Sequence, residues 1–396
     1  MTLKCGFMSE STVPASTVND QIVALAHDAG FSTAGIAPVP LPGEPADDPE
    51  LSQFEPYFEG WIERGYAGEM EYLKRRDQDN RLLRSSLRIA VPWARSVIVC
   101  AANYNADAPK SIDPASPESG WIARYAMTGY QPGEAEGTSR PSDYHDVLLA
   151  RLKNLEQSLQ QALGPFQARC YVDTGPLVER AYARYAGIGW TGKNTCIINQ
   201  KLGSWLFLGV ILTGLELPPA TPFALPEDRC GSCTRCIDAC PTGALVAPYQ
   251  MDASLCIAYL TIEKRGPIPE PLRPQMGRQV FGCDICQDVC PWNRRAPVSV
   301  DPELAARREL VNPALAWLAE LDAESFRSLF RQSPVQRAKL HGLLRNVAIA
   351  MGNSGLATYR PKLQEWAAGT DPVLAEAARW ALTRLSTTET NAQAQL

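Results

Sequence analysis

Apolar residues recur along the chain with two different periods. Four stretches place them three or four residues apart, the spacing that brings them onto one face of a helix. Three others are compact apolar runs, as in buried strands. The pattern predicts helices over 17–30, 57–76, 143–163 and 177–186, and strands over 96–104, 169–173 and 204–214.

The stretches between these elements differ in composition. Residues 38–56 and 105–141 hold few apolar side chains, which predicts surface loops. A proline-rich stretch at 218–228 predicts a joint between two domains. Beyond Pro297 the chain is rich in Ala, Leu and Arg at helical spacing, which predicts a helical tail whose last ten residues are disordered.

Two amphipathic segments of this tail, 342–355 and 373–385, carry small residues on one face. They resemble the helix pairs of HEAT-type repeats, although two copies also fit an ordinary helical cap. Both interpretations predict an all-α domain over 301–396.

Eight of the twelve cysteines have spacings that fit iron–sulfur clusters. A loop around a cubane presents thiolates at positions i, i+3 and i+6, and the cysteine before a proline ligates the other cluster of a pair. One run has this form in full, the second lacks one ligand, and an isolated cysteine supplies it. We predict two [4Fe–4S] clusters, the first bound by Cys230, Cys233, Cys236 and Cys290 and the second by Cys240, Cys256, Cys283 and Cys286.

Zinc ribbons and disulfides are the alternatives for such cysteines. A zinc knuckle needs only two Cys-x2-Cys pairs and gives no role to the Cys-Pro endings. The other four cysteines are scattered singly, which fits a reducing cytoplasm better than a disulfide scaffold. The chain is therefore predicted to transfer electrons. Its expected fold class is α+β, with a mixed α/β domain over 1–222 and a bacterial-ferredoxin-like domain over 223–300.

Composition and charge limit the possible partners. A chain of 396 residues with 45% hydrophobic residues is typical of a soluble protein of two or three domains. It has no apolar run of ~18 residues and no secretory signal, so we expect a cytoplasmic protein without a membrane partner. The net charge is −5, but residues 261–360 hold 14 Lys or Arg against 10 Asp or Glu, a local charge of +4. Such a region can bind phosphates, or it can be an ordinary solvated surface.

Two features outside the cysteines are candidates for a reactive site. Asp173 ends an apolar strand, a setting that partly removes an acid from water and suits it to proton donation; alternatively, it caps a helix that begins at Leu177. The stretch 187–194 holds three glycines, which let backbone amides approach a bound group. Asn194 stands where a phosphate-binding loop requires Ser or Thr, so a cofactor rich in amides or carbonyls fits better than ATP.

These motifs together resemble the epoxyqueuosine reductase family, also called the QueG family. The resemblance extends over roughly residues 17–300, and the helical tail is similar to the HEAT-like tail of many members. GEMEYL (68–73) and the Asp143-Tyr144-His145 helix start fit the same family. The main strings are VDTGPLVER (172–180), GIGWTGKN (187–194), CGSCTRCIDACPTGAL (230–245), CIAYLTIEKRG (256–266) and FGCDICQDVCPWN (281–293).

The resemblance implies a monomeric, cobalamin-dependent enzyme that reduces epoxyqueuosine to queuosine at the wobble position of a tRNA anticodon. It implies that the clusters, fed by an unidentified low-potential donor, generate nucleophilic Co(I), which opens the epoxide. An acid then protonates the alkoxide, and loss of water leaves the alkene. By position, Asp173 is the proton donor, and Lys264 and basic residues of the tail are candidates for contact with the anticodon stem-loop.

The resemblance also implies cobalamin-contacting positions. The second cluster is expected to lie nearest the corrin, because the same loops touch both. Two features depart from the family pattern: the stretch 130–142 is longer and richer in Gly and Pro, and Ala258 stands where Ser is common, so contact there is expected through the backbone. The implied positions are Arg75, Tyr125, Asp173, Gly192, Lys193, Asn194, Ile197, Leu208, Ala258, Arg265, Gly282, Cys283 and Asp284.

Three other functions fit parts of this pattern. A corrinoid reductive dehalogenase uses the same cofactors but is normally exported. A plain electron-transfer subunit would bind no cobalamin. An RNA-binding helical scaffold would hold redox-silent clusters as structural staples.

Overall fold

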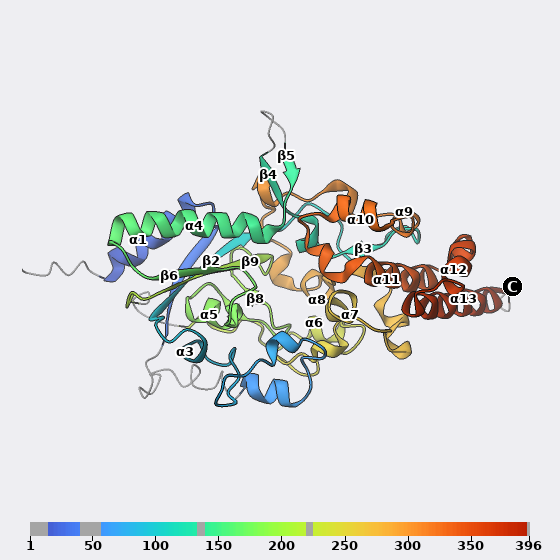
Figure 1. Cartoon of the computed structure of the whole chain (residues 1–396), viewed down its shortest axis with the longest axis horizontal. Helices are drawn as coiled ribbons and strands as arrows, with labels where there is room; N and C mark the ends of the chain where they lie inside the picture. Colours follow the sequence, from blue (N-terminus) through green and yellow to red (C-terminus); the bar gives the residue numbers. More distant parts are fainter. Residues whose placement is uncertain (1–14, 40–56, 133–138, 219–224, 394–396) are drawn as a thin grey trace, which may run out of the picture.

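The structure, a computed structural model, describes residues 15–39, 57–132, 139–218 and 225–393. The molecule is elongated, with a β-sheet at one end, a helical tail at the other, and the cysteine-bearing segments between them (Figure 1). No helix in the described part of the chain is both long and apolar enough to cross a membrane.

A four-stranded antiparallel sheet with the order β1-β2-β9-β6 forms the N-terminal part. Every residue of β2 is buried, because its side chains alternate between two apolar cores. Ile98 and Cys100 belong to the core on one face, and Val97 and Val99 to the core on the other. The strands are β1 (Thr33–Pro38), β2 (Ser96–Asn103), β6 (Ala168–Tyr171) and β9 (Leu206–Thr213).

Helices cover both faces of this sheet. The apolar stripes of α1 (Ala15–Asp28) and α4 (Tyr144–Leu163) pack on one face. The short helices α3 (Leu87–Ala90) and α5 (Glu179–Tyr185) pack on the other. An antiparallel sheet with segregated helices is an α+β arrangement, as predicted.

The predicted helices at 17–30, 143–163 and 177–186 and the three predicted strands are confirmed within a few residues. The helix predicted over 57–76 is wrong after its first two turns. It covers 57–63, and Gly65 and Gly68 then turn the chain with φ of +76° and +55°. Strand β1 was not predicted, and residues 40–56 of the predicted loop at 38–56 lie outside the described residues.

The surface loop predicted over 105–141 is wrong in its second half. The two-residue strand β3 (Trp121–Ile122) is buried and pairs in parallel with β10 (Gln279–Phe281). Strands β4 (Tyr130–Pro132) and β5 (Ser139–Pro141) form a hairpin. The segment therefore joins the first domain to the cysteine-rich one.

Short elements build the cysteine-rich region. The helices α6 (Arg235–Asp238) and α8 (Ile285–Asp288) pack against each other, and α7 (Ile257–Ile262) packs against β10. A small hairpin of β7 (Trp190–Thr191) and β8 (Ile197–Ile198) lies before β9 in the chain.

The tail is helical, as predicted, but its apolar core is shared with the cysteine-rich region. Val280 and Leu260 belong to the same buried cluster as Val347 and Leu363. A Cβ at Gly352 would come within 2.8 Å of Ala381, so small residues allow α11 and α13 to pack closely. Helix α13 continues through most of the last ten residues, which the sequence predicted to be disordered. The tail helices are α9 (Leu315–Ala319), α10 (Ala323–Phe330), α11 (Lys339–Ser354), α12 (Arg360–Ala367) and α13 (Pro372–Gln393).

Candidate active site

Asp173 follows β6 with a left-handed backbone conformation (φ 59°), which is uncommon outside glycine. The Tyr144 hydroxyl donates a hydrogen bond to Asp173 Oδ2 at 2.7 Å. The side chain of Asp173 is 67% exposed, so the expectation that the protein alone removes it from water is wrong. The N-cap of α5 is Val178, so the helix-cap alternative for Asp173 is also wrong. What remains is an accessible acid with a fixed hydrogen-bond partner.

The start of α4 shapes the surroundings of this acid. His145 Nε2 lies 3.9 Å from Asp173 Oδ2, and His145 Nδ1 lies 2.5 Å from Asp143 Oδ1. Burial disfavours the imidazolium, but the hydrogen bond to Asp143 and the nearby carboxylates outweigh it and raise the pKa of His145 above 6.5. Tyr144 is held by stacking on Phe207, with ring centres 4.0 Å apart. A group that readily holds a proton thus lies beside Asp173.

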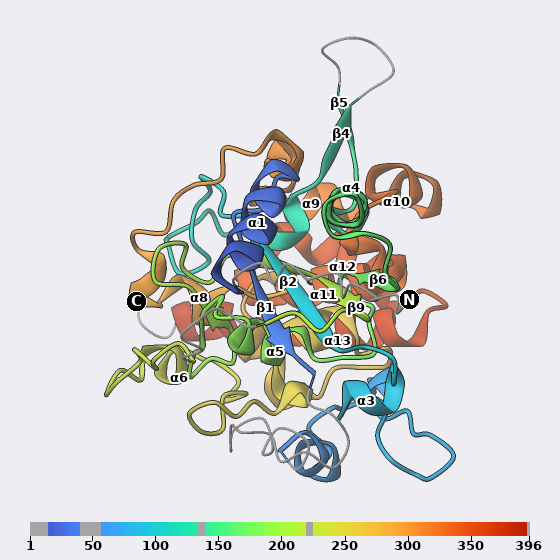
Figure 2. The same cartoon turned by 90° about the vertical axis from the view of Figure 1, so that its left-hand side faces the viewer.

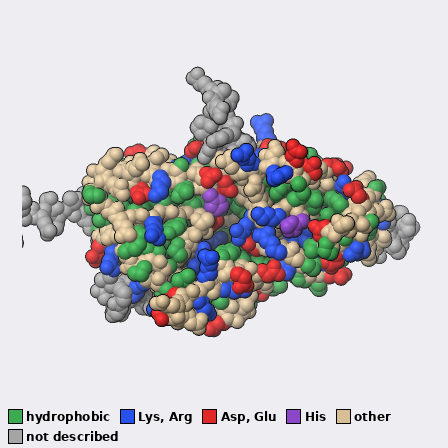
Figure 3. Space-filling view, in the orientation of Figure 1, with side chains coloured by type: hydrophobic (Ala, Val, Ile, Leu, Met, Phe, Trp, Pro, Cys, Tyr) green, Lys and Arg blue, Asp and Glu red, His purple; other side chains and the backbone are tan. Residues whose placement is uncertain are grey.

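A second wall of the site comes from distant parts of the chain. Two guanidinium groups approach the Tyr72 ring, that of Arg84 at 5.6 Å and that of Arg337 at 5.4 Å from its centre. Arg337 also pairs with Glu263 at 2.9 Å. Burial and the charges of Glu263 and Asp173 raise the pKa of Tyr72, so this ring lies within electrostatic reach of the acid. On the face shown in Figure 3, Lys and Arg side chains gather beside two histidines at the middle of the molecule.

Sequence reasoning gave no role to Tyr72 or Arg84, and it included Arg337 only among the basic residues of the tail. Tyr72 lies inside the GEMEYL string, which was the one available signal. The contact between Tyr72 and Arg337 joins residues far apart in the chain, so no local pattern predicts it.

Glu179 is a further acid that sequence reasoning missed. It begins α5, and its Oε1 is buried with no hydrogen-bond partner among the described residues. Burial and the charge of Asp173 raise the pKa of Glu179 to about 7, although Arg84 and Arg180 lower it. Such a carboxyl group can either donate or accept a hydrogen bond near neutral pH.

Tyr125 connects the region of Asp173 with the second set of cysteines. Its ring meets that of Tyr144 edge-on at 6.1 Å and lies 6.2 Å from that of Phe281. Burial and the charges of Asp173 and Asp284 raise the pKa of Tyr125 well above its ordinary value. The proposed acid and the chain next to Cys283 therefore both lie within reach of one partly buried phenol.

The chain around Cys283 is tightly packed. Gly282 has φ of +70°, and a Cβ there would come within 2.4 Å of Ala123. Asp284 is buried and accepts a hydrogen bond from the backbone N–H of Arg124 at 2.6 Å. Burial and the charge of Asp288 raise the pKa of Asp284 to about 7.

Two glycines of the stretch 187–194 make close contacts within the chain. A Cβ at Gly189 would lie 2.3 Å from the carbonyl oxygen of Ile198, and one at Gly192 would lie 2.5 Å from its Cδ1. These glycines let the β7–β8 hairpin close on itself. This packing is by itself a sufficient reason for glycine at both positions.

Lys193 and Asn194 connect this hairpin to the cysteine loops. The buried Lys193 ammonium donates to the carbonyls of Gly231 at 2.5 Å and Cys233 at 3.1 Å. Asn194 Nδ2 donates to the carbonyl of Cys286 at 3.3 Å. Both side chains hold cysteine-bearing backbone, so in this structure they position the loops.

Electrostatic interactions connect the eight predicted cysteine ligands within two groups of four. Cys240 interacts electrostatically with Cys283, and Cys290 with Cys230 and Cys236, so each pre-proline cysteine joins the group of the other run. In the described part of the chain, no group of side chains is arranged to hold a single metal ion. A cubane differs from such a site, because each thiolate binds its own iron. The groups are Cys230, Cys233, Cys236 and Cys290, and Cys240, Cys256, Cys283 and Cys286.

A ninth cysteine, Cys196, was not predicted to take part. Its thiol shares a hydrogen bond with that of Cys286, and this bond lowers the pKa of Cys196. The hairpin thus contacts the second group through a side chain as well as through Asn194.

The other implied cobalamin and tRNA positions lie in varied surroundings. Ile197 is buried and Leu208 partly buried in the apolar core beneath the sheet. The carbonyl of Ala258, in α7, accepts a hydrogen bond from Thr261. Arg75 is exposed.

Of the two remaining positions, one contacts the turn at residues 65–70 and the other contacts the tail. Lys264 pairs with Glu69. Arg265 is exposed and donates to the carbonyl of Arg337 at 2.8 Å. This places both cations on the same wall as Tyr72.

Two family models match this chain. One, described as "Epoxyqueuosine reductase QueG, DUF1730", covers residues 84–174, and the other, described as "4Fe-4S double cluster binding domain", covers 229–293. The second span contains all eight predicted cysteine ligands, and the prediction of two [4Fe–4S] clusters is confirmed at the level of the domain.

Curated relatives decide the family. The epoxyqueuosine reductase of Pseudomonas aeruginosa is 38% identical over 83% of this chain and 83% of its own length. That of Escherichia coli K12 is 36% identical over 89% of this chain and 86% of its own length. This chain belongs to the epoxyqueuosine reductase family. Its arrangement of acid, hairpin and cysteine loops is therefore that of a member of the family.

Solved epoxyqueuosine reductases have the same fold. One in complex with an epoxyqueuosine-modified tRNA-Tyr stem loop has a TM-score of 0.77 and 28% identity, covering 94% of this chain and 91% of that one. Another, from Streptococcus thermophilus, has a TM-score of 0.76 and 27% identity with the same coverage. The epoxyqueuosine reductase fold thus includes the helical tail, since the match extends over nearly the whole chain.

Proposed function

We propose that this chain reduces the epoxide of epoxyqueuosine in tRNA to the alkene of queuosine. The observation that carries the proposal is the exposed Asp173, hydrogen-bonded to Tyr144, in an epoxyqueuosine reductase family member with two groups of four cysteines. The reaction adds two electrons and two protons to the epoxide and releases one water molecule. Two clusters suit it because each can hold one electron.

We propose cobalamin as the cofactor of the same site. Its periphery carries many amide groups, and the unpartnered buried Oε1 of Glu179 would accept a hydrogen bond from one of them. Tyr125, Gly282 and Asp284 lie toward the second cluster and would contact the corrin. When bound, cobalamin would supply a nucleophilic metal centre that opens the epoxide.

The residues at the start of α4 would manage the protons. Opening of the ring leaves a negative oxygen, and Asp173, as a carboxylic acid, gives it a proton. Tyr144 holds the carboxyl group in one orientation. His145, 3.9 Å away and with a raised pKa, would return a proton to Asp173, so that the oxygen can leave as water.

We propose that the anticodon loop binds along the wall of Tyr72. Single-stranded RNA is recognised by stacking on aromatic rings and by contacts to its phosphates. Tyr72 is 37% exposed, and Lys264, Arg265 and Arg337 lie around it. A phosphate would then replace Glu69 as the partner of Lys264.

A single-turnover assay tests the function. Protein purified without oxygen and loaded with cobalamin is reduced chemically, mixed with epoxyqueuosine-containing tRNA, and the nucleosides are read by mass spectrometry. We expect loss of one oxygen, slowed by about 10²–10⁴-fold in Asp173→Asn because the general acid is lost. Asp20→Asn, which alters an exposed acid of α1, should react at the wild-type rate.

Two results would contradict parts of this proposal. An unchanged nucleoside, with clusters and cobalamin intact, would indicate a corrinoid reductase with another substrate. Failure to bind cobalamin at all would indicate an electron carrier.

A further inference from the structure

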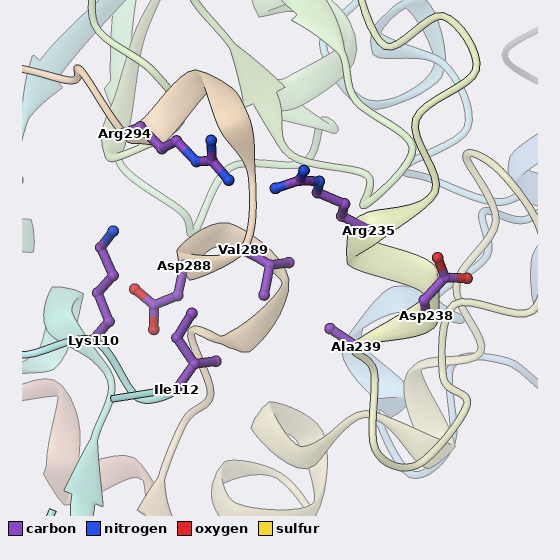
Figure 4. A pocket seen from close by; sticks show the side chains of 8 residues that line it. All are labelled: Lys110, Ile112, Arg235, Asp238, Ala239, Asp288, Val289 and Arg294. Carbon is purple, nitrogen blue, oxygen red and sulfur yellow. The ribbon is translucent and has the colours of Figure 1, made fainter. Parts of the chain in front are cut away.

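A surface groove of about 490 Å³ lies between the two cysteine loops and a loop of the first domain. The lining residues come from α6 and α8, from the turn after α8, and from residues 110–112 (Figure 4). They are Lys110, Ile112, Arg235, Asp238, Ala239, Asp288, Val289 and Arg294.

The groove adjoins the first group of cysteines directly. Arg235 precedes Cys236, and Val289 precedes Cys290. The chain around the first group is open to solvent, with residues 227–229, 231, 232, 234 and 235 all exposed. Around Cys283, by contrast, the neighbours at 280–282 and 284 are buried. The first cluster is therefore the one that a partner at the surface can approach.

The chemistry of the groove is cationic around an apolar centre. Figure 4 shows the guanidinium groups of Arg235 and Arg294 directed toward one another, and Lys110 adds a third positive charge. Of the two acids, Asp288 is buried and accepts hydrogen bonds from Ser111, so its charge is turned away from solvent.

The apolar centre includes Ile112, whose side chain is 47% exposed. The other acid, Asp238, accepts a hydrogen bond from Thr234 at 2.7 Å. An exposed apolar contact ringed by cations is suited to a weak, electrostatically steered interface with an acidic protein.

The groove is on a different side of the molecule from α4, whose first residues contact Asp173. In Figure 2, α6 and α8 lie on the left, whereas α4, which carries His145, lies on the right. A tRNA bound at Asp173 would leave the groove open to a second partner.

We propose that this groove docks a small acidic electron-transfer protein of the flavodoxin class, which reduces the cluster of Cys230, Cys233, Cys236 and Cys290. The inference rests on the proposed function. Each docking event passes one electron from the anionic flavin hydroquinone, which becomes the neutral semiquinone, to the cluster. Two events supply the two electrons of one epoxide reduction.

Binding is the first test, because it does not depend on turnover. The affinity of oxidised bacterial flavodoxin for the cluster-loaded protein is measured by titration calorimetry at low and high salt. We expect Arg235→Glu and Arg294→Glu to weaken binding at least about tenfold each, and salt to weaken wild-type binding, because the attraction is electrostatic. Arg327→Glu, a charge reversal on the exposed face of α10, should bind like the wild type.

Turnover then separates docking from chemistry. With photoreduced 5-deazariboflavin, an uncharged small reductant, the groove variants should reduce epoxyqueuosine at the wild-type rate, and only flavodoxin-driven turnover should fall. Iron content and cluster spectra establish that each variant is intact, and Lys110→Glu, which adjoins no cysteine, replaces any variant that is not.

Three results bear on the two proposals separately. Flavodoxin binding that all three reversals leave unchanged would overturn the docking site. Loss of tRNA affinity in the same variants would overturn it in favour of an RNA surface. A nucleoside left unchanged by every reductant would reject the proposed function, while the binding data would still decide the docking site.

Discussion

At the scale of single residues, the candidate site depends on the turn that begins α4. Asp143 accepts hydrogen bonds from both the backbone N–H and the ring of His145, so one carboxylate caps the helix and holds the imidazole. Tyr144, between them in sequence, reaches Asp173 instead. Three consecutive residues therefore orient Asp173 and the imidazole that can return a proton to it.

The pKa of His145 tests this arrangement. Its folded-state pKa is raised, so the stabilisation from its protonation is present below its ordinary value of 6.5 and is lost as pH rises through the folded value. We expect Asp143→Asn to lower the pKa of His145, because the hydrogen bond to a carboxylate and the charge are removed. An NMR titration can follow it, since the chain has three histidines.

The same variant should change the stability profile in a defined direction. Wild type should lose stability relative to Asp143→Asn as pH rises from about 6.5. An unchanged titration of His145 would contradict the assigned role of Asp143.

At the scale of elements, the β7–β8 hairpin holds the two cysteine loops together. Lys193 reaches the first loop and Asn194 the second, both through backbone carbonyls. The cysteine loops contain only short helices, so they depend on such contacts from outside for their geometry.

We expect Lys193→Met to make the first cluster more labile. The change leaves two carbonyls near the cysteines without their donor, at a cost of about 1–3 kcal/mol. Iron content and electron paramagnetic resonance after brief exposure to air measure it, and one cluster should be lost before the other. Lys201→Met, in an exposed turn of the same region, is the matched control. Equal loss of both clusters would contradict a role confined to the first loop.

At the scale of the whole molecule, the helical tail is part of the structure that carries the site. Arg345 of α11 is buried and donates to the carbonyls of Leu260, Lys264 and Gly266. Burial lowers the pKa of Arg345 to about 10. The tail thus sets the position of the loop that bears Lys264 and Arg265.

We expect Arg345→Met to lower the free energy of unfolding by about 3 kcal/mol, because it leaves one buried and two partly buried carbonyls without this donor. The melting temperature by circular dichroism should fall by several degrees, and affinity for the tRNA stem loop should fall with it. Arg331→Met, at an exposed position, should change the melting temperature and the tRNA affinity much less. A stable variant with weak tRNA binding would show that Arg345 contacts RNA instead of holding the loop.

Local chemistry made much of the molecule predictable. Cluster ligands follow a spacing within a few residues, and the helix of 143–163 has its apolar stripe and its cap in one segment. The helix predicted over 57–76 is too long because two glycines with positive φ end it. A periodic pattern of apolar residues does not reveal which conformation a glycine adopts. The surface loop predicted over 105–141 is wrong in part because its buried strand β3 is stabilised by β10, which is distant in the chain.

The sequence by itself determined the family, and it predicted the two sets of cysteines and the acid at Asp173, because ligand spacing and short motifs are properties of neighbouring residues. Only the tertiary structure decided which glycines serve packing, that Lys193 supports a cysteine loop, and that Tyr72 and Glu179 lie near the acid. Those relations arise where segments far apart in the chain exclude water from one another, and burial and charge between such segments have no counterpart in a local pattern.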